Sequence, residues 1–177
     1  MARFPERRPR PVTASNADLA RDFLDLSFAL ESGRPLERFT RFEGPITLRL
    51  TGAPSATLRA DLARLLRRLR QEAGIVIRPV SSGAASITIE AVPRDAIRAA
   101  LPQAACFVVP NVGSLAEYRA NTGAPRTRWS RLERRDRVAI FVPADASPQE
   151  SRDCLHEELA QALGPLNDLY RLPQSVF

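Results

Sequence analysis

The chain lacks several features, and each absence excludes a class of protein. Its 177 residues contain no lysine, one histidine, two cysteines and eight glycines, while 44% are hydrophobic. One histidine and two cysteines are too few for a Cys/His zinc site or for a disulfide-dense scaffold. No apolar run approaches the roughly 18–20 residues of a membrane span, and residues 1–10 contain no apolar core of a secretory leader. What remains is one globular domain with a hydrophobic core.

All 26 basic residues are arginines, and they are unevenly distributed along a chain of net charge +6. Residues 147–177 carry five acidic side chains and two arginines, a net charge of −3, so residues 1–146 carry +9. Seven arginines lie within residues 119–137, near Tyr118 and Trp129. This stretch is either a solvated Arg-rich loop or a surface that binds a polyanion through phosphate contacts and stacking. No motif of a nucleic-acid-binding fold accompanies it, so we do not expect a nucleic-acid partner.

The two cysteines, Cys106 and Cys154, lie far apart in the sequence and do not form a CxxC pair. They are therefore either one disulfide or two buried thiols. A disulfide would place the protein in an oxidising compartment, because the cytosol keeps thiols reduced.

Apolar periodicity and turn residues predict an α+β domain with a mixed sheet of about five strands and helices packed on it. After an Arg/Pro-rich flexible arm over residues 1–14, one domain is expected over residues 15–177. The first helix begins at Ser15 or Asn16, places Leu19 and Phe23 on its buried side, and ends at Gly33. The other expected helices cover about 56–73, 93–101 and 148–163, the strands 45–51, 75–80, 86–92, 106–109 and 137–143, and a loop or insertion 111–135.

The last helix has the best-marked ends of any element in the chain. Ser147-Pro148-Gln149-Glu150 is a capping box with proline at the first helical position, and Gly164-Pro165 ends the helix. Leu155 and Leu159 fall on one face and are expected to be buried. The helix and the following turn are expected to present five polar side chains to one cleft, namely Glu157, Glu158, Gln161, Asn167 and Asp168.

This segment resembles the extended motif of zincin metallopeptidases of the metzincin branch. Their helix carries His-Glu-x-x-His, with a glycine three positions on and a third ligand three beyond it. The present chain keeps every spacing but changes all three ligand residues, over Glu157-Glu158-x-x-Gln161-x-x-Gly164-x-x-Asn167. The resemblance implies a zincin-like fold with the motif on the last helix. It also implies Glu158 as the general base, and metal ligands at Glu157, Gln161, Asn167 and the adjacent Asp168.

The chemistry of these residues leaves alternatives open. Zinc prefers imidazole and thiolate ligands, and neutral amide oxygens bind it poorly. The set would suit a harder divalent ion such as calcium, or no ion at all. In the second case Glu157 or Glu158 accepts backbone or arginine donors, and the following turn is braced by hydrogen bonds. His156 is expected to be a structural hydrogen-bonding residue rather than a partner of Cys154 in a catalytic dyad.

The chain is also similar to a proteobacterial family of unknown function whose members are often described as putative lipoproteins. The matching blocks are residues 15–23, 41–45 and 109–111 and, most specifically, residues 154–168. Membership implies a periplasmic or cell-envelope location, a Cys106–Cys154 disulfide, and a lipid anchor carried by a leader removed before residue 1. A zincin-like domain would continue past Phe177 to a Met-turn, whereas the only methionine in this chain is Met1.

Two functions follow from these resemblances. The first is a non-catalytic zincin-like module that binds a peptide or an envelope protein, through the cleft or through the Arg-rich residues 119–137. The second is a metal-dependent peptidase with unusual ligands, in which Glu158 activates a water molecule.

Overall fold

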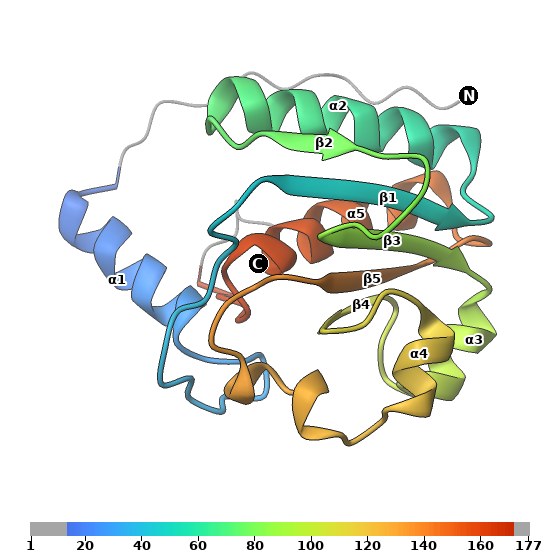
Figure 1. Cartoon of the computed structure of the whole chain (residues 1–177). Coiled ribbons are helices and arrows are strands. Elements are labelled where there is room, and N and C mark those ends of the chain that lie inside the picture. The colour runs from blue at the N-terminus through green and yellow to red at the C-terminus, as the bar shows by residue number, and fades with distance from the viewer. Residues whose placement is uncertain (1–13, 172–177) are drawn as a thin grey trace.

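The computed structural model describes residues 14–171, and its centre is a mixed sheet of five strands (Figure 1). The strands lie in the order β2-β1-β3-β5-β4, and the edge strand β4 runs antiparallel to β5 while the others are parallel. Their bounds are β1 Ile46–Gly52, β2 Ile77–Pro79, β3 Ile87–Val92, β4 Phe107–Pro110 and β5 Val138–Pro143. The predicted α+β fold is thereby confirmed. The expected arm over residues 1–14 lies almost entirely outside the described residues.

Helices cover both faces of this sheet, and β5 shows why. All six of its residues are buried, and alternate side chains enter two separate cores because strand side chains alternate between faces. One core packs β5 against the long helices α2 (Ala56–Glu72) and α5 (Pro148–Leu163). The other packs it against the short helices α3 (Arg94–Ala100) and α4 (Leu115–Ala120).

The first helix is shorter than predicted, and its apolar side is only partly buried. Helix α1 covers Asn16–Ser27, and Leu19 and Phe23 are 45% and 50% exposed. The chain turns back at Gly33, where φ is +74°, so that the Leu36 N–H donates to the carbonyl of Phe28. These contacts take residues 28–36 out of the helix and leave α1 at the periphery of the molecule (Figure 1).

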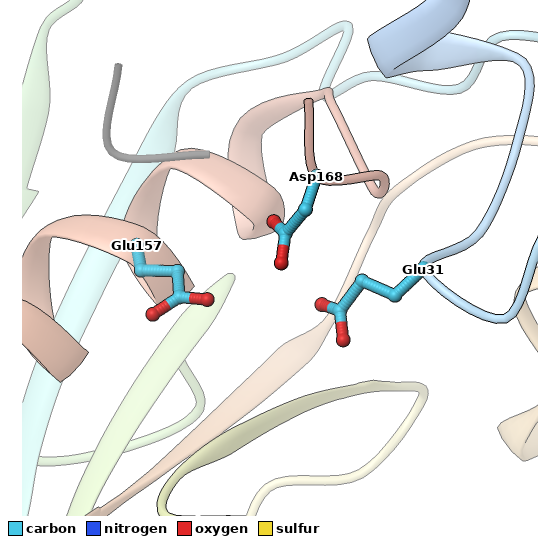
Figure 2. A group of neighbouring side chains, drawn as sticks. All are labelled: Glu31, Glu157 and Asp168. Atoms are coloured by element: carbon cyan, nitrogen blue, oxygen red, sulfur yellow. The ribbon is translucent and has the colours of Figure 1, made fainter. Parts of the chain in front are cut away.

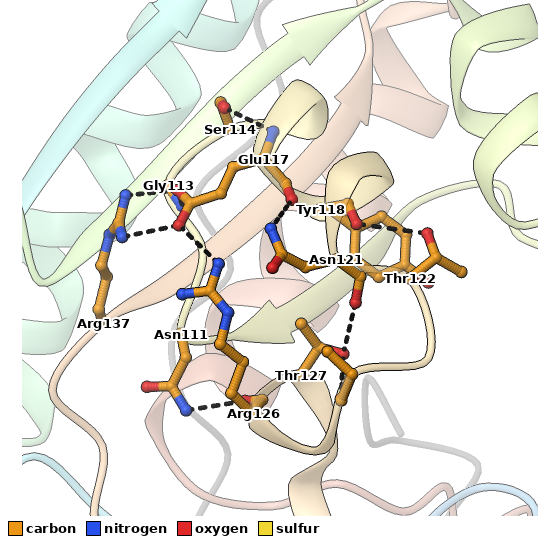
Figure 3. Close-up of polar contacts among 11 residues, drawn as sticks. Asn111, Gly113, Ser114, Glu117, Tyr118, Asn121, Thr122, Arg126, Thr127 and Arg137 are labelled. Carbon is orange, nitrogen blue, oxygen red and sulfur yellow. Dashed lines mark hydrogen bonds and ion pairs between the residues drawn. The ribbon is translucent and has the colours of Figure 1, made fainter.

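The segment predicted as a loop over 111–135 contains α4 and two 3₁₀ turns, Pro125–Thr127 and Trp129–Arg131. It is held by Glu117, whose carboxylate accepts hydrogen bonds from Arg126, from Arg137 and from the Gly113 N–H (Figure 3). Ser114 caps α4 by accepting from the Glu117 N–H. A helix of six residues is too short for its apolar periodicity to be recognised in the sequence.

The Arg-rich residues 119–137 are largely engaged within the fold. Arg119 and Arg128 donate to the carbonyls of Ala96 and Gly123, and Arg134 pairs with Asp136.

Among the described residues, no helix is both long and apolar enough to cross a membrane.

Candidate functional site

A cavity of about 380 Å³ opens between α5 and the segment that leads into the edge strand β4. One wall is made by Leu101, residues 103–106 and the start of β4, and the opposite wall by Glu157, Glu158 and Gln161 of α5. The turn after α1, Trp129 and Leu166 complete its lining. The cavity therefore lies against the part of the last helix that the sequence indicated as the site.

The disulfide joins these two walls. Cys106 precedes β4 and Cys154 lies in the second turn of α5, and their Cα atoms are 5.9 Å apart. The disulfide that the family resemblance implied is therefore present. Because the Sγ atom of Cys154 is bonded to Cys106, it is not available as a nucleophile for His156.

Three carboxylates from distant parts of the chain meet beside the cavity. Glu157 projects from α5, Asp168 from the turn after α5, and Glu31 from the turn after α1, and Figure 2 shows their carboxylates gathered together. One oxygen from each side chain lies within 4.8 Å of one oxygen from each of the others. Glu158, next along α5, is only 4% exposed and lines the same cavity.

Backbone contacts between α1 and the C-terminal turn place Glu31 in this group. The Leu166 N–H donates to the carbonyl of Leu26 at 2.9 Å, and the Glu31 N–H donates to the carbonyl of Leu166 at 3.2 Å. These two bonds hold the turn after α1 against the turn after α5. Sequence reasoning missed Glu31 because nothing in its neighbourhood indicates which distant segment it contacts.

The two amide side chains of the predicted set brace the site. Gln161 Nε2 donates to Glu31 Oε1 at 2.6 Å, and Asn167 Nδ2 donates to the carbonyl of Asp25 at 3.0 Å. Gln161 thus orients Glu31, and Asn167 ties the C-terminal turn to the end of α1. The structure brings Glu157, Glu158 and Asp168 together as acids, while Gln161 and Asn167 donate hydrogen bonds to neighbouring segments.

Burial and mutual repulsion raise the pKa values of these carboxyls. Burial, followed by repulsion from Asp168 and Glu31, raises the pKa of Glu157 to about 7. Burial is also the main reason that the pKa of Glu158 lies well above 4.5, with Glu157 as the next cause. Burial raises the pKa of Asp168 as well. These carboxyl groups therefore hold protons more tightly than exposed acids do.

We expect the stability of the protein, freed of metal ions by a chelator, to fall as the pH rises from about 4.5, the ordinary pKa of a glutamate, to about 7, the pKa of folded Glu157. A carboxyl whose pKa is raised by folding stabilises the protein below its unfolded pKa and loses that contribution as the pH rises through its folded pKa. The contribution of this half-buried group is roughly 2 kcal/mol. Urea unfolding at a series of pH values measures it.

The matched variant for this measurement is Glu157→Gln, which cannot titrate. The difference in unfolding free energy between wild type and variant should change between about pH 4.5 and pH 7. A difference that stays constant with pH would show that Glu157 ionises normally in the folded protein.

His156 lies away from this site. It is half-buried and lines an apolar groove of about 390 Å³ between α2 and α5, with Leu65, Leu69 and Leu163. Burial in this groove is the main reason that its pKa is lowered from 6.5. The groove that His156 lines is therefore separate from the cavity that Glu157 and Glu158 line, although both lie beside α5.

Comparisons with known proteins place the chain in a family without a known activity. A search of curated proteins finds no match to the chain. The family model described as "Protein of unknown function (DUF2927)" matches residues 16–177, which is most of the chain. The chain therefore belongs to the DUF2927 family of proteins of unknown function.

Proposed function

We propose that this domain is a non-catalytic, zincin-like module of the cell envelope that binds an extended polypeptide between β4 and α5. The observation that carries this proposal is the cavity itself, which joins the start of an edge strand to the helix with the motif. Edge strands bind extended peptides by strand addition, in which backbone hydrogen bonds give affinity and side-chain pockets give specificity. All four residues of β4 are buried, so the largely exposed segment before it, residues 103–105, would supply the backbone groups, and the cavity would take one side chain of the ligand.

The order of the elements supports the zincin-like part of the proposal. A strand, a long helix, two strands, two further strands each preceded by a short helix, and a final helix with the motif follow in this order, which agrees with the layout that the zincin resemblance implies. The side chains support a module without zinc chemistry. Gln161 and Asn167, which stand at two ligand positions, use their amide groups to brace Glu31 and Asp25. Glu157 at the remaining position is not a histidine, so the set lacks the ligands that zinc prefers.

The disulfide supports the cell-envelope part of the proposal. Disulfides persist in oxidising compartments such as the bacterial periplasm and are rare in the cytosol. The Cys106–Cys154 bond is compatible with that location. A lipid anchor on a removed leader would hold the domain at the membrane surface.

A metal-dependent peptidase is the second candidate, and Glu158 is the observation that favours it. Its carboxyl group lines the cavity, is almost fully buried and has a raised pKa. These are properties of general acids and bases in enzyme sites. In this alternative Glu158 would take a proton from a water molecule activated by a metal ion, with the ligands drawn from Glu157, Gln161, Asn167 and Asp168.

Fluorescence anisotropy with an arrayed library of unstructured, dye-labelled peptides tests both candidates. The variant Ala105→Trp fills the cavity, because Ala105 is exposed and lines it. The matched control is Ala99→Trp, on the exposed side of α3. We expect wild type and control to bind the same peptides and Ala105→Trp to bind them at least about tenfold more weakly, a loss of about 1.4 kcal/mol.

Mass spectrometry of the same peptides separates the two candidates. Intact peptides after prolonged incubation, both without and with added divalent ions, are expected for the binding module. Cleavage that disappears in Glu158→Gln would replace the module with the peptidase. An absence of any bound peptide, or equal binding by Ala105→Trp, would overturn the cleft as the binding site.

A further inference from the structure

The charge of the acidic cluster, defined as Glu31, Glu157 and Asp168, has no counterion among the described residues. No ion pair in residues 14–171 includes any of the three, or Glu158 beside them. Arg171, in the same C-terminal turn, pairs instead with Asp22 and Asp25. Carboxylates held this close repel one another unless a proton or a cation lies between them.

The spacing of the cluster fits a calcium ion. Calcium takes oxygen ligands at about 2.3–2.6 Å, so two ligand oxygens on opposite sides of one ion are about 5 Å apart at most. The three carboxylate oxygens lie within 4.8 Å of one another, inside this limit. Magnesium demands near-ideal octahedral geometry and gives up its water ligands reluctantly, so a set of carboxylates from three separate segments suits calcium better.

Two buried carboxylate oxygens have no hydrogen-bond partner, one on Asp168 of the cluster and one on Glu158, a separate residue that lines the same cavity as Glu31 and Glu157. Glu158 is 4% exposed, and its Oε2 atom is buried without a partner. The Oδ1 atom of Asp168 is buried and unpartnered as well. Buried acceptors without partners are uncommon, because each has lost its water without a replacement. A cation bound at the cluster would satisfy Asp168 directly and would offset the negative charge of Glu158.

The residues around the cluster are already arranged to hold it. Gln161 donates to Oε1 of Glu31 and so fixes the direction of that carboxylate. Asn167, immediately before Asp168, is tied to Asp25. The three acids come from the turn after α1, from α5 and from the turn after α5, so one ion would link three segments that are distant in the sequence.

We propose that Glu31, Glu157 and Asp168 form a binding site for one calcium ion, with Glu158 as the buried acid behind it. This site differs from the set drawn from the zincin resemblance, because Glu31 replaces Gln161 and Asn167 as a source of oxygen ligands. It goes beyond the binding of a polypeptide and does not depend on it. The ion would fix the turn after α1 against α5 and thereby close one end of the cavity.

Isothermal titration of the full chain with calcium chloride, after treatment with a chelator, tests the site at neutral pH. We expect one ion per chain, with a dissociation constant in the micromolar to millimolar range of calcium sites. Saturating calcium should also raise the melting temperature by several degrees, because the ion binds the folded state. Magnesium and zinc are titrated in parallel and are expected to bind at least about tenfold more weakly.

Asp168→Asn and Glu31→Gln are the test variants, since each removes one negative charge with little change in shape. Both should lose at least about tenfold in calcium affinity, yet melt no lower than wild type in chelator because repulsion is relieved. Glu133→Gln, at a side chain that is 85% exposed in a surface ion pair, is the control and should bind calcium normally. This melting measurement separates loss of the ion from loss of the fold.

Three results would overturn the site. These are no calcium binding by wild type, calcium binding that is unchanged in Asp168→Asn and Glu31→Gln, or tighter binding of zinc than of calcium. Peptide binding is measured separately and without divalent ions. Failure of the calcium site is therefore distinguishable from failure of the proposed polypeptide-binding function.

Discussion

Replacement of Arg135 by methionine is expected to lower the free energy of unfolding by about 3–5 kcal/mol. Arg135 is 2% exposed, and no ion pair among the described residues includes it. Its guanidinium donates to the carbonyls of Gln161 and Gly164 and to Oγ1 of Thr40, and it lies 4.8 Å from the ring centroid of Trp129. Burial lowers its pKa to about 9, so it remains charged at neutral pH.

The size of this effect comes from the end of α5. The last carbonyls of a helix have no partner within the helix and carry partial negative charge. Arg135 satisfies two such carbonyls and links them to Thr40, in the segment between α1 and β1. Methionine would fill part of the space but would leave these buried acceptors unsatisfied. Arg135→Lys should recover little of the lost stability, because a single ammonium group cannot donate to all three acceptors with the geometry of the planar guanidinium.

Urea unfolding of Arg135→Met, Arg135→Lys and Arg134→Met measures this contribution. Arg134 is the matched control, because it is adjacent in sequence but its side chain is 69% exposed. We expect its replacement to leave the unfolding midpoint unchanged. A midpoint for Arg135→Met equal to that of the control would show that solvent replaces the guanidinium at no cost. Arg135→Glu, which a surface interpretation of residues 119–137 would use to probe partner binding, would instead report on folding.

The elements that could be predicted from the sequence are those marked by local chemistry. Ser147 and Glu150 form the expected capping box, and Ser55 caps α2. The alternation of β1 and the apolar run of β5 follow from burial on one or both faces of a sheet. The end of α1 was not predicted, because the contact between Phe28 and Leu36 that ends it depends on the path of the chain after Gly33.

Only the part of the candidate site whose residues are close together in the sequence could be predicted. Glu157, Glu158 and Asp168 lie on one helix and its following turn, so their spacing alone indicated a shared cleft. Glu31 joins them through contacts between two turns that lie 135 residues apart, at Glu31 and Leu166. Spacing also does not reveal whether an amide side chain donates a hydrogen bond or offers its oxygen to a metal. The spacing therefore predicts Gln161 and Asn167 as ligands, whereas their amide groups brace the neighbouring segments.

Removal of the disulfide by the double substitution Cys106→Ala and Cys154→Ala is expected to destabilise the domain by about 2–4 kcal/mol. The two cysteines are separated by 48 positions. Closing a loop of this length removes conformational entropy from the unfolded chain worth about 4 kcal/mol in the chain-entropy description. Either single substitution should cost nearly as much as the double one, because each breaks the same bond.

Besides restricting the unfolded chain, the disulfide is expected to hold part of the folded structure in place. It fastens the segment before β4 to α5, so its loss frees one wall of the cavity from the other. Trp129 is the only tryptophan of the chain and lines that cavity together with Cys106, so its fluorescence reports on the cavity. In native conditions the double variant should show more quenching of Trp129 by acrylamide than the oxidised wild type does.

Wild type treated with a reductant is the control for both readouts. It should match the double variant in urea midpoint and in Trp129 quenching, because both lack only the covalent link. If the double variant were destabilised while its quenching stayed that of the oxidised protein, the wall would be held by packing alone. The disulfide would then act on the unfolded chain and not on the cleft. Increased quenching with weaker peptide binding would instead make the bond a determinant of the shape that the cleft presents to its ligand.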